Sequence, residues 1–118
     1  MEYKSRLLVL DKSIDLSVKI YQITKLNLKD LTLFRQLRSS ALSIPSNIAE
    51  GDQLDSVKQN LKHLYIARGS LSELKTQLLI SKRVKYINDK DYQELLIVCD
   101  IIGKMLNKLI KVKQSYIT

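Results

Sequence analysis

Lysine and arginine side chains are the residues of this sequence whose number and placement could do chemistry. The 118 residues carry 20 Lys and Arg against 12 Asp and Glu, which gives a formal charge of +8 at pH 7. Residues 60–118 hold eleven of the basic side chains and only five of the acidic ones. Such an excess attracts polyanions, so it favours nucleic acid as a partner, with an anionic membrane surface in second place.

The basic positions group into two zones if the last two helices pair antiparallel. With the connecting turn centred near Ile87, Lys108 and Lys111 come level with Ile66 and His63, toward the start of the preceding helix. The candidate nucleic-acid-binding residues are Lys58, Lys62, Lys82, Arg83, Lys85, Lys104, Lys108 and Lys111. No aromatic-interleaved groove accompanies them, so phosphate-directed, salt-sensitive and sequence-tolerant binding is predicted. The alternative is that these charges only keep the protein soluble.

Catalytic and metal-binding groups are sparse in this sequence. His63 is the only histidine, and it is expected to carry charge on a solvated face without an acid partner. Di-metal bundles use Glu-x-x-His pairs, whereas Asn60 stands three residues before His63. The three glycines, Gly51, Gly69 and Gly103, are too scattered for a phosphate-binding loop. We therefore expect no enzymatic activity, no cofactor and no metal.

Apolar periodicity predicts four helices, over residues 8–26, 31–50, 56–84 and 88–112. Residues 1–7 are expected to form a short leader and residues 113–118 a loose tail. Asp30 or Thr32 can cap the second helix, Ser56 with Gln59 forms a capping box for the third, and Asn88 caps the fourth. Because the connections are short, successive helices should run antiparallel. The prediction is one all-α domain over residues 1–118, an antiparallel up-down-up-down four-helix bundle.

Apolar stripes mark the predicted core. Near-heptad positions on the third helix form one stripe: Leu61, Leu64, Ala67, Leu71, Leu74 and Leu78. The core arc of the fourth helix contains Leu95, Val98, Cys99, Ile102, Met105, Leu106 and Leu109. The first helix carries two stripes, one with Val9, Leu16, Ile20 and Ile23 and another with Leu10, Ile14, Val18 and Tyr21. This arc is wider than one core-facing stripe needs, so the surplus predicts contact with a neighbouring subunit.

Pro45, the only proline, marks the predicted irregularity of the second helix. Proline lacks an N–H and its ring presses on the carbonyl four residues back, that of Ala41, so a kink is expected. Gly51 is expected to close the helix in a left-handed conformation. Gly69 lies in mid-helix, where glycine costs about 1 kcal/mol relative to alanine, so another backbone should approach it closely.

Two motifs carry a resemblance to a known family. They are residues 43–51, Ser-Ile-Pro-Ser-Asn-Ile-Ala-Glu-Gly, and residues 64–71, Leu-Tyr-Ile-Ala-Arg-Gly-Ser-Leu, followed by residues 73–74 and 76–80. The chain resembles the bacterial four-helix-bundle family that includes proteins encoded in intervening sequences of large-subunit ribosomal RNA genes. The same family includes the accessory variability protein of diversity-generating retroelements. Structural roles are expected for the motif residues Pro45, Asn47, Glu50, Gly51, Arg68, Gly69 and Glu73, with ion pairs formed by the charged ones.

The resemblance also implies self-association, because the retroelement protein forms a barrel-like homopentamer with a positively charged surface. We therefore predict a homopentameric, non-enzymatic adaptor that binds RNA or DNA nonspecifically, and the ribosomal relatives favour RNA. A reverse transcriptase is a candidate protein partner. The alternative is a purely structural, protein-interaction oligomer whose positive charge is incidental. No apolar run is long enough to span a membrane, so a cytoplasmic protein without a membrane partner is expected.

Overall fold

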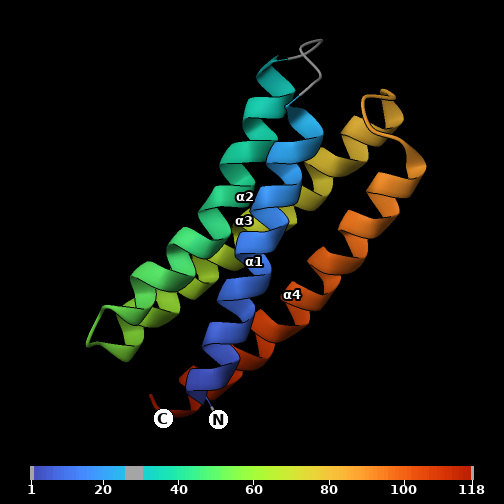
Figure 1. Cartoon of the computed structure of the whole chain (residues 1–118). Helices are drawn as coiled ribbons and strands as arrows, with labels where there is room; N and C mark the ends of the chain where they lie inside the picture. The colour runs from blue at the N-terminus through green and yellow to red at the C-terminus, as the bar shows by residue number, and fades with distance from the viewer. Residues whose placement is uncertain (1, 26–30, 118) are drawn as a thin grey trace.

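The fold is a bundle of four long helices (Figure 1). The computed structural model describes residues 2–25 and 31–117. The helices are α1 (Glu2–Thr24), α2 (Leu31–Asp52), α3 (Val57–Arg83) and α4 (Asp89–Ser115). Each helix packs on its neighbours in sequence and α1 also packs on α4, so the four form a closed ring of antiparallel neighbours. This arrangement confirms the predicted all-α, up-down-up-down four-helix bundle.

One apolar core runs through the bundle. The predicted stripe of α3 is buried in full, and the buried members of the predicted α4 arc are Leu95, Cys99, Ile102, Leu106 and Leu109. Val98 and Met105 pack against them while partly exposed. The buried apolar side chains of α2 are Phe34, Leu37, Ala41, Ile44 and Ile48, and those of α1 are Val9, Leu16 and Ile20. The helical period therefore predicted correctly which side of α1, α3 and α4 is buried.

Both chain ends are more helical than predicted. α1 begins at Glu2, within the predicted leader, and α4 ends at Ser115, within the predicted tail. Tertiary contacts fall within both extensions, because Nε of Arg6 in α1 lies 3.1 Å from a carboxylate oxygen of Asp52 in α2, and Lys113 of α4 is buried. Contact with other helices therefore supports both helix ends where the local apolar pattern is weak.

The helix caps follow the sequence for α3 and α4. The Ser56 hydroxyl accepts a hydrogen bond from the backbone N–H of Gln59 at 3.4 Å. The side-chain oxygen of Asn88 accepts one from the backbone N–H of Asp91 at 2.7 Å. At the start of α2, Thr32 lies inside the helix, so it is not the cap. The other predicted cap, at position 30, and the predicted end of the first helix, at position 26, lie outside the described residues.

The backbone of α2 continues as a helix through Pro45. Proline has no N–H to offer the carbonyl of Ala41, which is buried. The hydroxyl of Ser17 on α1 lies 2.8 Å from that carbonyl oxygen and 3.0 Å from the carbonyl oxygen of Ser13, so its hydrogen is shared with Ala41 as the nearer acceptor. A neighbouring helix thus supplies the hydrogen bond that Pro45 cannot make. The kink itself stays a prediction.

Neither Gly51 nor Gly69 has the role that was predicted for it. Gly51 has no positive φ and does not end α2, which continues to Asp52. A Cβ at Gly51 would lie 3.1 Å from the Cβ of His63, so this glycine permits close contact between α2 and α3. A Cβ at Gly69 would meet nothing within 4 Å. The close approach predicted at Gly69 therefore occurs at Gly51, because the helices converge at that end.

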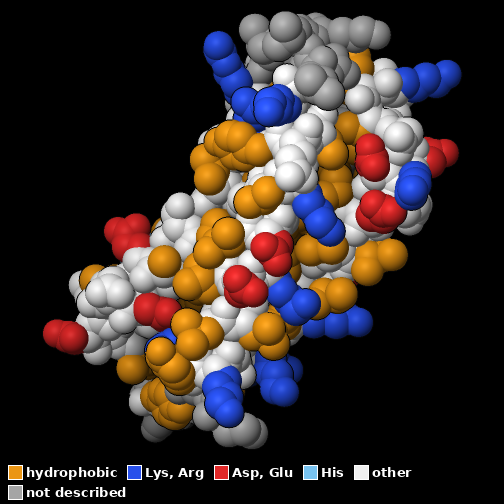
Figure 2. Space-filling model, in the orientation of Figure 1, with side chains coloured by type: hydrophobic (Ala, Val, Ile, Leu, Met, Phe, Trp, Pro, Cys, Tyr) orange, Lys and Arg blue, Asp and Glu red, His pale blue; other side chains and the backbone are white. Residues whose placement is uncertain are grey.

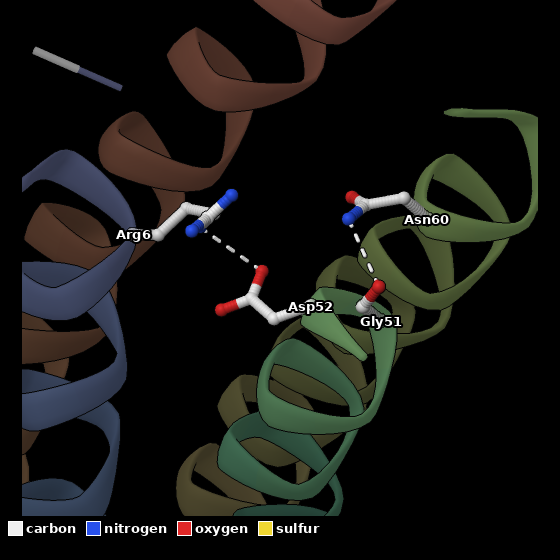
Figure 3. Close-up of polar contacts among 4 residues, drawn as sticks. All are labelled: Arg6, Gly51, Asp52 and Asn60. Atoms are coloured by element: carbon white, nitrogen blue, oxygen red, sulfur yellow. Dashed lines mark hydrogen bonds and ion pairs between the residues drawn. The ribbon is translucent and has the colours of Figure 1, made fainter. Parts of the chain in front are cut away.

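Two polar contacts tie α1, α2 and α3 together at the end of α2 (Figure 3). The side-chain amide of Asn60 donates to the carbonyl oxygen of Gly51 at 3.0 Å. The Nε atom of Arg6 lies 3.1 Å from a carboxylate oxygen of Asp52, and both side chains are mostly shielded from solvent. These contacts hold the connection between α2 and α3 against α1.

Lys85 occupies a backbone conformation that normally selects glycine. Its φ is 64°, and the N–H groups of Tyr86 and Lys85 donate to the carbonyls of Ser81 and Lys82, both at 2.9 Å. This is the Schellman pattern, in which the left-handed residue follows the end of the helix. A side chain is unfavourable there, so the turn retains lysine at a cost in stability.

We expect Lys85→Gly to raise the free energy of unfolding by about 0.5–1 kcal/mol, because relief of the left-handed strain exceeds the added entropy of the unfolded chain. Chemical denaturation measures the change. Arg83→Gly, at the last residue of α3, is the control and should not stabilise the protein, because its backbone is helical and glycine is less favourable there than arginine. A Lys85→Gly protein no more stable than the parent would contradict the assignment of strain.

Candidate nucleic-acid interface

Contacts between α3 and α4 establish their register. The Nζ atom of Lys75 lies 2.8 Å from a carboxylate oxygen of Asp100. Further along, Nη1 of Arg68 donates to the side-chain oxygen of Asn107 at 3.2 Å. In each pair the two residues are equally far in sequence from the turn next to Ile87. This confirms the antiparallel register predicted for these helices.

Basic side chains line one side of this helix pair. Tyr65 and Gln114 meet across it, with the amide of Gln114 donating to the Tyr65 hydroxyl at 2.9 Å. Residues three, four or seven positions from Tyr65 on α3, or from Gln114 on α4, lie on or next to the side of the helix pair where these two meet. The resulting surface, called here the basic α3–α4 face, consists of Lys58, Lys62, Arg68, Lys75, Lys104 and Lys111. Asp100 is the acidic residue among them, and it is paired with Lys75.

The structure separates the remaining predicted contacts from this face. Lys108 lines a hollow with Ser5 and Leu8, so it points toward α1 although it lies between Lys104 and Lys111 in sequence. At the far end of the bundle, a second hollow brings together Lys82, Arg83, Lys85, Asn88 and Asp89. We call Lys82, Arg83 and Lys85 the basic turn. The two predicted basic zones thus exist at opposite ends, and Lys108 belongs to neither.

Within the basic turn, Lys82 has neighbours of its own. Its Nζ atom lies 3.9 Å from a carboxylate oxygen of Asp89 and 4.9 Å from the centre of the Tyr92 ring. The ion pair is long and Asp89 is exposed, so it holds the lysine weakly. Arg83 and Lys85 are exposed. The basic turn can therefore present its cations to a polyanion.

Sequence reasoning missed two members of the basic α3–α4 face. Arg68 was assigned a structural role, and Lys75 was not singled out. Both connect the lysines at the start of α3 with the basic turn at its end. The signal was present in the sequence, since basic or polar residues, Tyr65 included, recur at three- or four-residue spacing from Lys58 to Lys75.

The family-like motifs meet along a polar seam between α2 and α3. The hydroxyl of Ser40 donates to a carboxylate oxygen of Glu73 at 3.0 Å. One turn on, the hydroxyls of Ser43 and Ser70 lie 2.7 Å apart. Glu73 therefore has a hydroxyl partner where an ion pair was expected, because small polar residues of α2 face it across the seam.

His63 also belongs to this seam, which corrects the expectation of a solvated face. Its Nδ1 atom lies 2.9 Å from the side-chain oxygen of Asn47, and the ring is half-buried. The amide of Asn47 in turn donates to the carbonyl oxygen of Ser43 at 2.8 Å. Ion pairs in the described ranges 2–25 and 31–117 involve neither Glu50 nor Arg68. Glu50 is exposed, and Arg68 faces α4.

Groups for other chemistry are not gathered in the described part of the chain. Among residues 2–25 and 31–117, no three His, Cys, Asp or Glu side chains are grouped so that they could hold a metal ion. Cys99 is buried, and that burial raises the pKa of its thiol to about 12, so the unreactive thiol form prevails at neutral pH. None of the described helices is long and apolar enough to cross a membrane.

Four antiparallel helices with an exposed basic side define a small protein of the four-helix-bundle class. The chain belongs to the 23S rRNA-intervening sequence protein family, whose model matches residues 5–108. It is also similar to a crystal structure from Bacteroides thetaiotaomicron, described as a protein of unknown function from the S23 ribosomal protein family. The two share 28% identity over 91% of this chain and 98% of the other, with a TM-score of 0.85. Among curated proteins, none matches the chain.

Proposed function

We propose that this protein is a cytoplasmic, non-enzymatic adaptor that binds RNA through the basic α3–α4 face and the basic turn. The observation that supports it most is the one-sided charge: several exposed cations line α3 and α4, and Asp100, the carboxylate among them, is already paired. The name of the family, which refers to an intervening sequence of 23S rRNA, favours RNA over DNA.

The proposed contacts are directed at phosphates. Lysine ammonium groups on flexible stems neutralise phosphates without reading base edges. Tyr65, the aromatic residue next to this face, already stacks on Arg68, whose guanidinium carbon lies 5.3 Å from the ring centre. No second ring on the described part of the face is placed to stack a base with it. Binding should therefore tolerate many sequences and depend strongly on salt.

The test is binding of the purified protein to structured ribosomal RNA and to duplex DNA across a salt series, followed by fluorescence anisotropy. With roughly four phosphate contacts, we expect the affinity to fall about 100-fold between 50 and 200 mM salt. A preference for RNA at equal salt would favour the ribosomal branch of the family. No binding at 50 mM salt, or an affinity that salt does not change, would overturn the proposal.

We also propose that the protein self-associates as a homopentamer through an outer stripe on α1, made of Leu7, Ile14, Val18 and Tyr21. These side chains are exposed by 38–49%, and Figure 2 shows hydrophobic side chains gathered along the border of α1 and α2. The stripe supports self-association, and the number five rests on the resemblance to the retroelement protein. A monomeric mass by light scattering would overturn this part.

The outer stripe also favours a second function, a structural or protein-interaction oligomer with incidental charge. Its partner would be another protein that covers apolar side chains, for which a reverse transcriptase is the candidate. The genes next to this one are a simple test of the reverse transcriptase partner, because the retroelement role requires a reverse transcriptase gene nearby. Weak RNA binding together with a stable oligomer would favour this second function.

A further inference from the structure

A hollow opens between α3 and α4 in the middle of the basic α3–α4 face. Its volume is about 380 Å³. The polar and charged residues that line it are Arg68, Ser72, Lys75, Asp100, Lys104 and Asn107, and the small or apolar ones are Leu71, Cys99 and Gly103. Cations, a hydroxyl and an amide thus converge on one concave surface that the proposed lysine contacts do not explain.

Arg68 is held in place at this hollow from two directions. Asn107 accepts a hydrogen bond from its Nη1 at 3.2 Å, and the ring of Tyr65 lies 5.3 Å from its guanidinium carbon. Tyr65 is itself held by the amide of Gln114, which donates to its hydroxyl at 2.9 Å. The other N–H groups of the guanidinium have no partner among the described residues, so a positioned fork of donors is available.

The charge around the hollow is unbalanced. Lys75 and Asp100 neutralise each other at 2.8 Å, and the Asp100 carboxylate raises the pKa of the Lys75 ammonium group through that hydrogen bond. Arg68 and Lys104 then remain as two positive charges without an ion pair in the described ranges. An oxyanion bound between Arg68 and Lys104 would neutralise this excess positive charge.

The floor of the hollow is open because Gly103 has no side chain. A Cβ there would meet only the Cδ2 atom of Leu71, at 3.4 Å, so packing between the helices does not demand glycine. Glycine inside a helix is less favourable than alanine. Absence of a side chain at this position keeps the space between Arg68 and Lys104 free.

We propose that this hollow binds a phosphate oxyanion, with the guanidinium of Arg68 as a bidentate donor and Lys104 as the second cation. The Ser72 hydroxyl and the Asn107 amide would supply neutral donors. The proposal rests on the proposed function, because in the RNA complex the group bound would be a backbone phosphate. A free phosphate or a nucleotide offers the same chemistry. Arginine suits this role because its planar fork matches two phosphate oxygens.

The first arm of the test compares two substitutions that preserve charge, Arg68→Lys and Arg35→Lys, in the full chain. Loss of the fork at the hollow should lower the affinity for structured RNA about tenfold, as expected when a charged hydrogen bond is lost. Arg35→Lys, at an exposed position of α2 outside both basic surfaces, should change the affinity less than twofold. Equal effects of the two substitutions on RNA binding would overturn the backbone-phosphate form of the proposal.

The second arm titrates the protein with inorganic phosphate against sodium chloride of matched ionic strength, followed by NMR. Saturable shifts at the Gly103 amide that are lost in Arg68→Lys would assign the hollow to free phosphate if RNA binding does not depend on Arg68. If phosphate causes no NMR shift, and the two substitutions of the first arm change RNA affinity equally, the proposed site is overturned altogether. If the parent protein binds no RNA, the proposed function fails and this arm still decides the hollow.

Discussion

Reversing the charge at Lys104 and Lys111 together is expected to lower the affinity for structured RNA about 100-fold at low salt. Both lysines are exposed on α4, which meets α3 nearby through the hydrogen bond from Arg68 to Asn107. Glutamate at these positions removes two phosphate contacts and places carboxylates beside the RNA. The slope of log affinity against log salt should also become shallower by about 2, roughly 1 for each lost lysine contact.

The control for this prediction is Lys4→Glu with Lys19→Glu. Both lysines are exposed on α1, so the net charge changes by the same amount on another side of the bundle. We expect the control to keep most of the affinity, because exposed charges beyond about 8–10 Å are largely screened at physiological salt. Equal losses in the two double variants would mean that net charge matters and the basic α3–α4 face does not.

Single reversals of neighbouring lysines add an internal check on the same prediction. Lys111→Glu should weaken binding more than Lys108→Glu, since Lys108 lines the hollow on the α1 side. Lys108 is three residues from Lys111, which turns its side chain about 60° around the axis of α4, to the side of the hollow shared with α1.

Ser17→Ala is expected to lower the free energy of unfolding by about 2 kcal/mol. The Ser17 hydroxyl donates to the carbonyl oxygen of Ala41 at 2.8 Å, between buried parts of α1 and α2. That carbonyl has no helical donor because position 45 is proline. Removal of the hydroxyl leaves a buried acceptor without a partner, which costs more than the loss of an ordinary exposed hydrogen bond. Denaturant unfolding measures the difference.

A double-mutant cycle with Pro45→Ala tests the cause. Alanine at position 45 restores a backbone N–H for the carbonyl of Ala41, so Ser17→Ala should then cost less than about 1 kcal/mol. Ser13→Ala is the matched control, since the buried Ser13 hydroxyl donates only one turn back, to Leu10 at 2.8 Å. If Ser17→Ala lowers the free energy of unfolding by the same amount in the parent protein and in Pro45→Ala, the link between Ser17 and Pro45 is wrong.

Much of the candidate site could be predicted because it depends on local regularities. The helical period placed Leu61 through Leu78 in the core, which left Lys58, Lys62 and their successors on the outside of α3. A short turn capped by Asn88 makes α3 and α4 run antiparallel, and its position near Ile87 sets which levels of the two helices lie side by side. These features need only the neighbouring residues in the chain and the geometry of one turn.

The motif residues show where such reasoning stops. His63 has a polar partner, Asn47, that lies 16 residues away on another helix. Arg68 is held by a residue 39 positions away. Neither partner follows from periodicity, because the rotation of one helix about its axis relative to the next depends on how whole faces interlock.

The sequence by itself determined the four helices, their buried sides, two caps and the antiparallel order, since each depends on propensities and periods within a helix or across one short connection. Only the tertiary structure decided that Gly51 permits the close approach and Gly69 does not. It also turned Lys108 toward α1 and joined Arg68 and Lys104 around one hollow. Distances between helices and the directions of side chains across them depend on the packing of all four helices at once, which no single segment specifies.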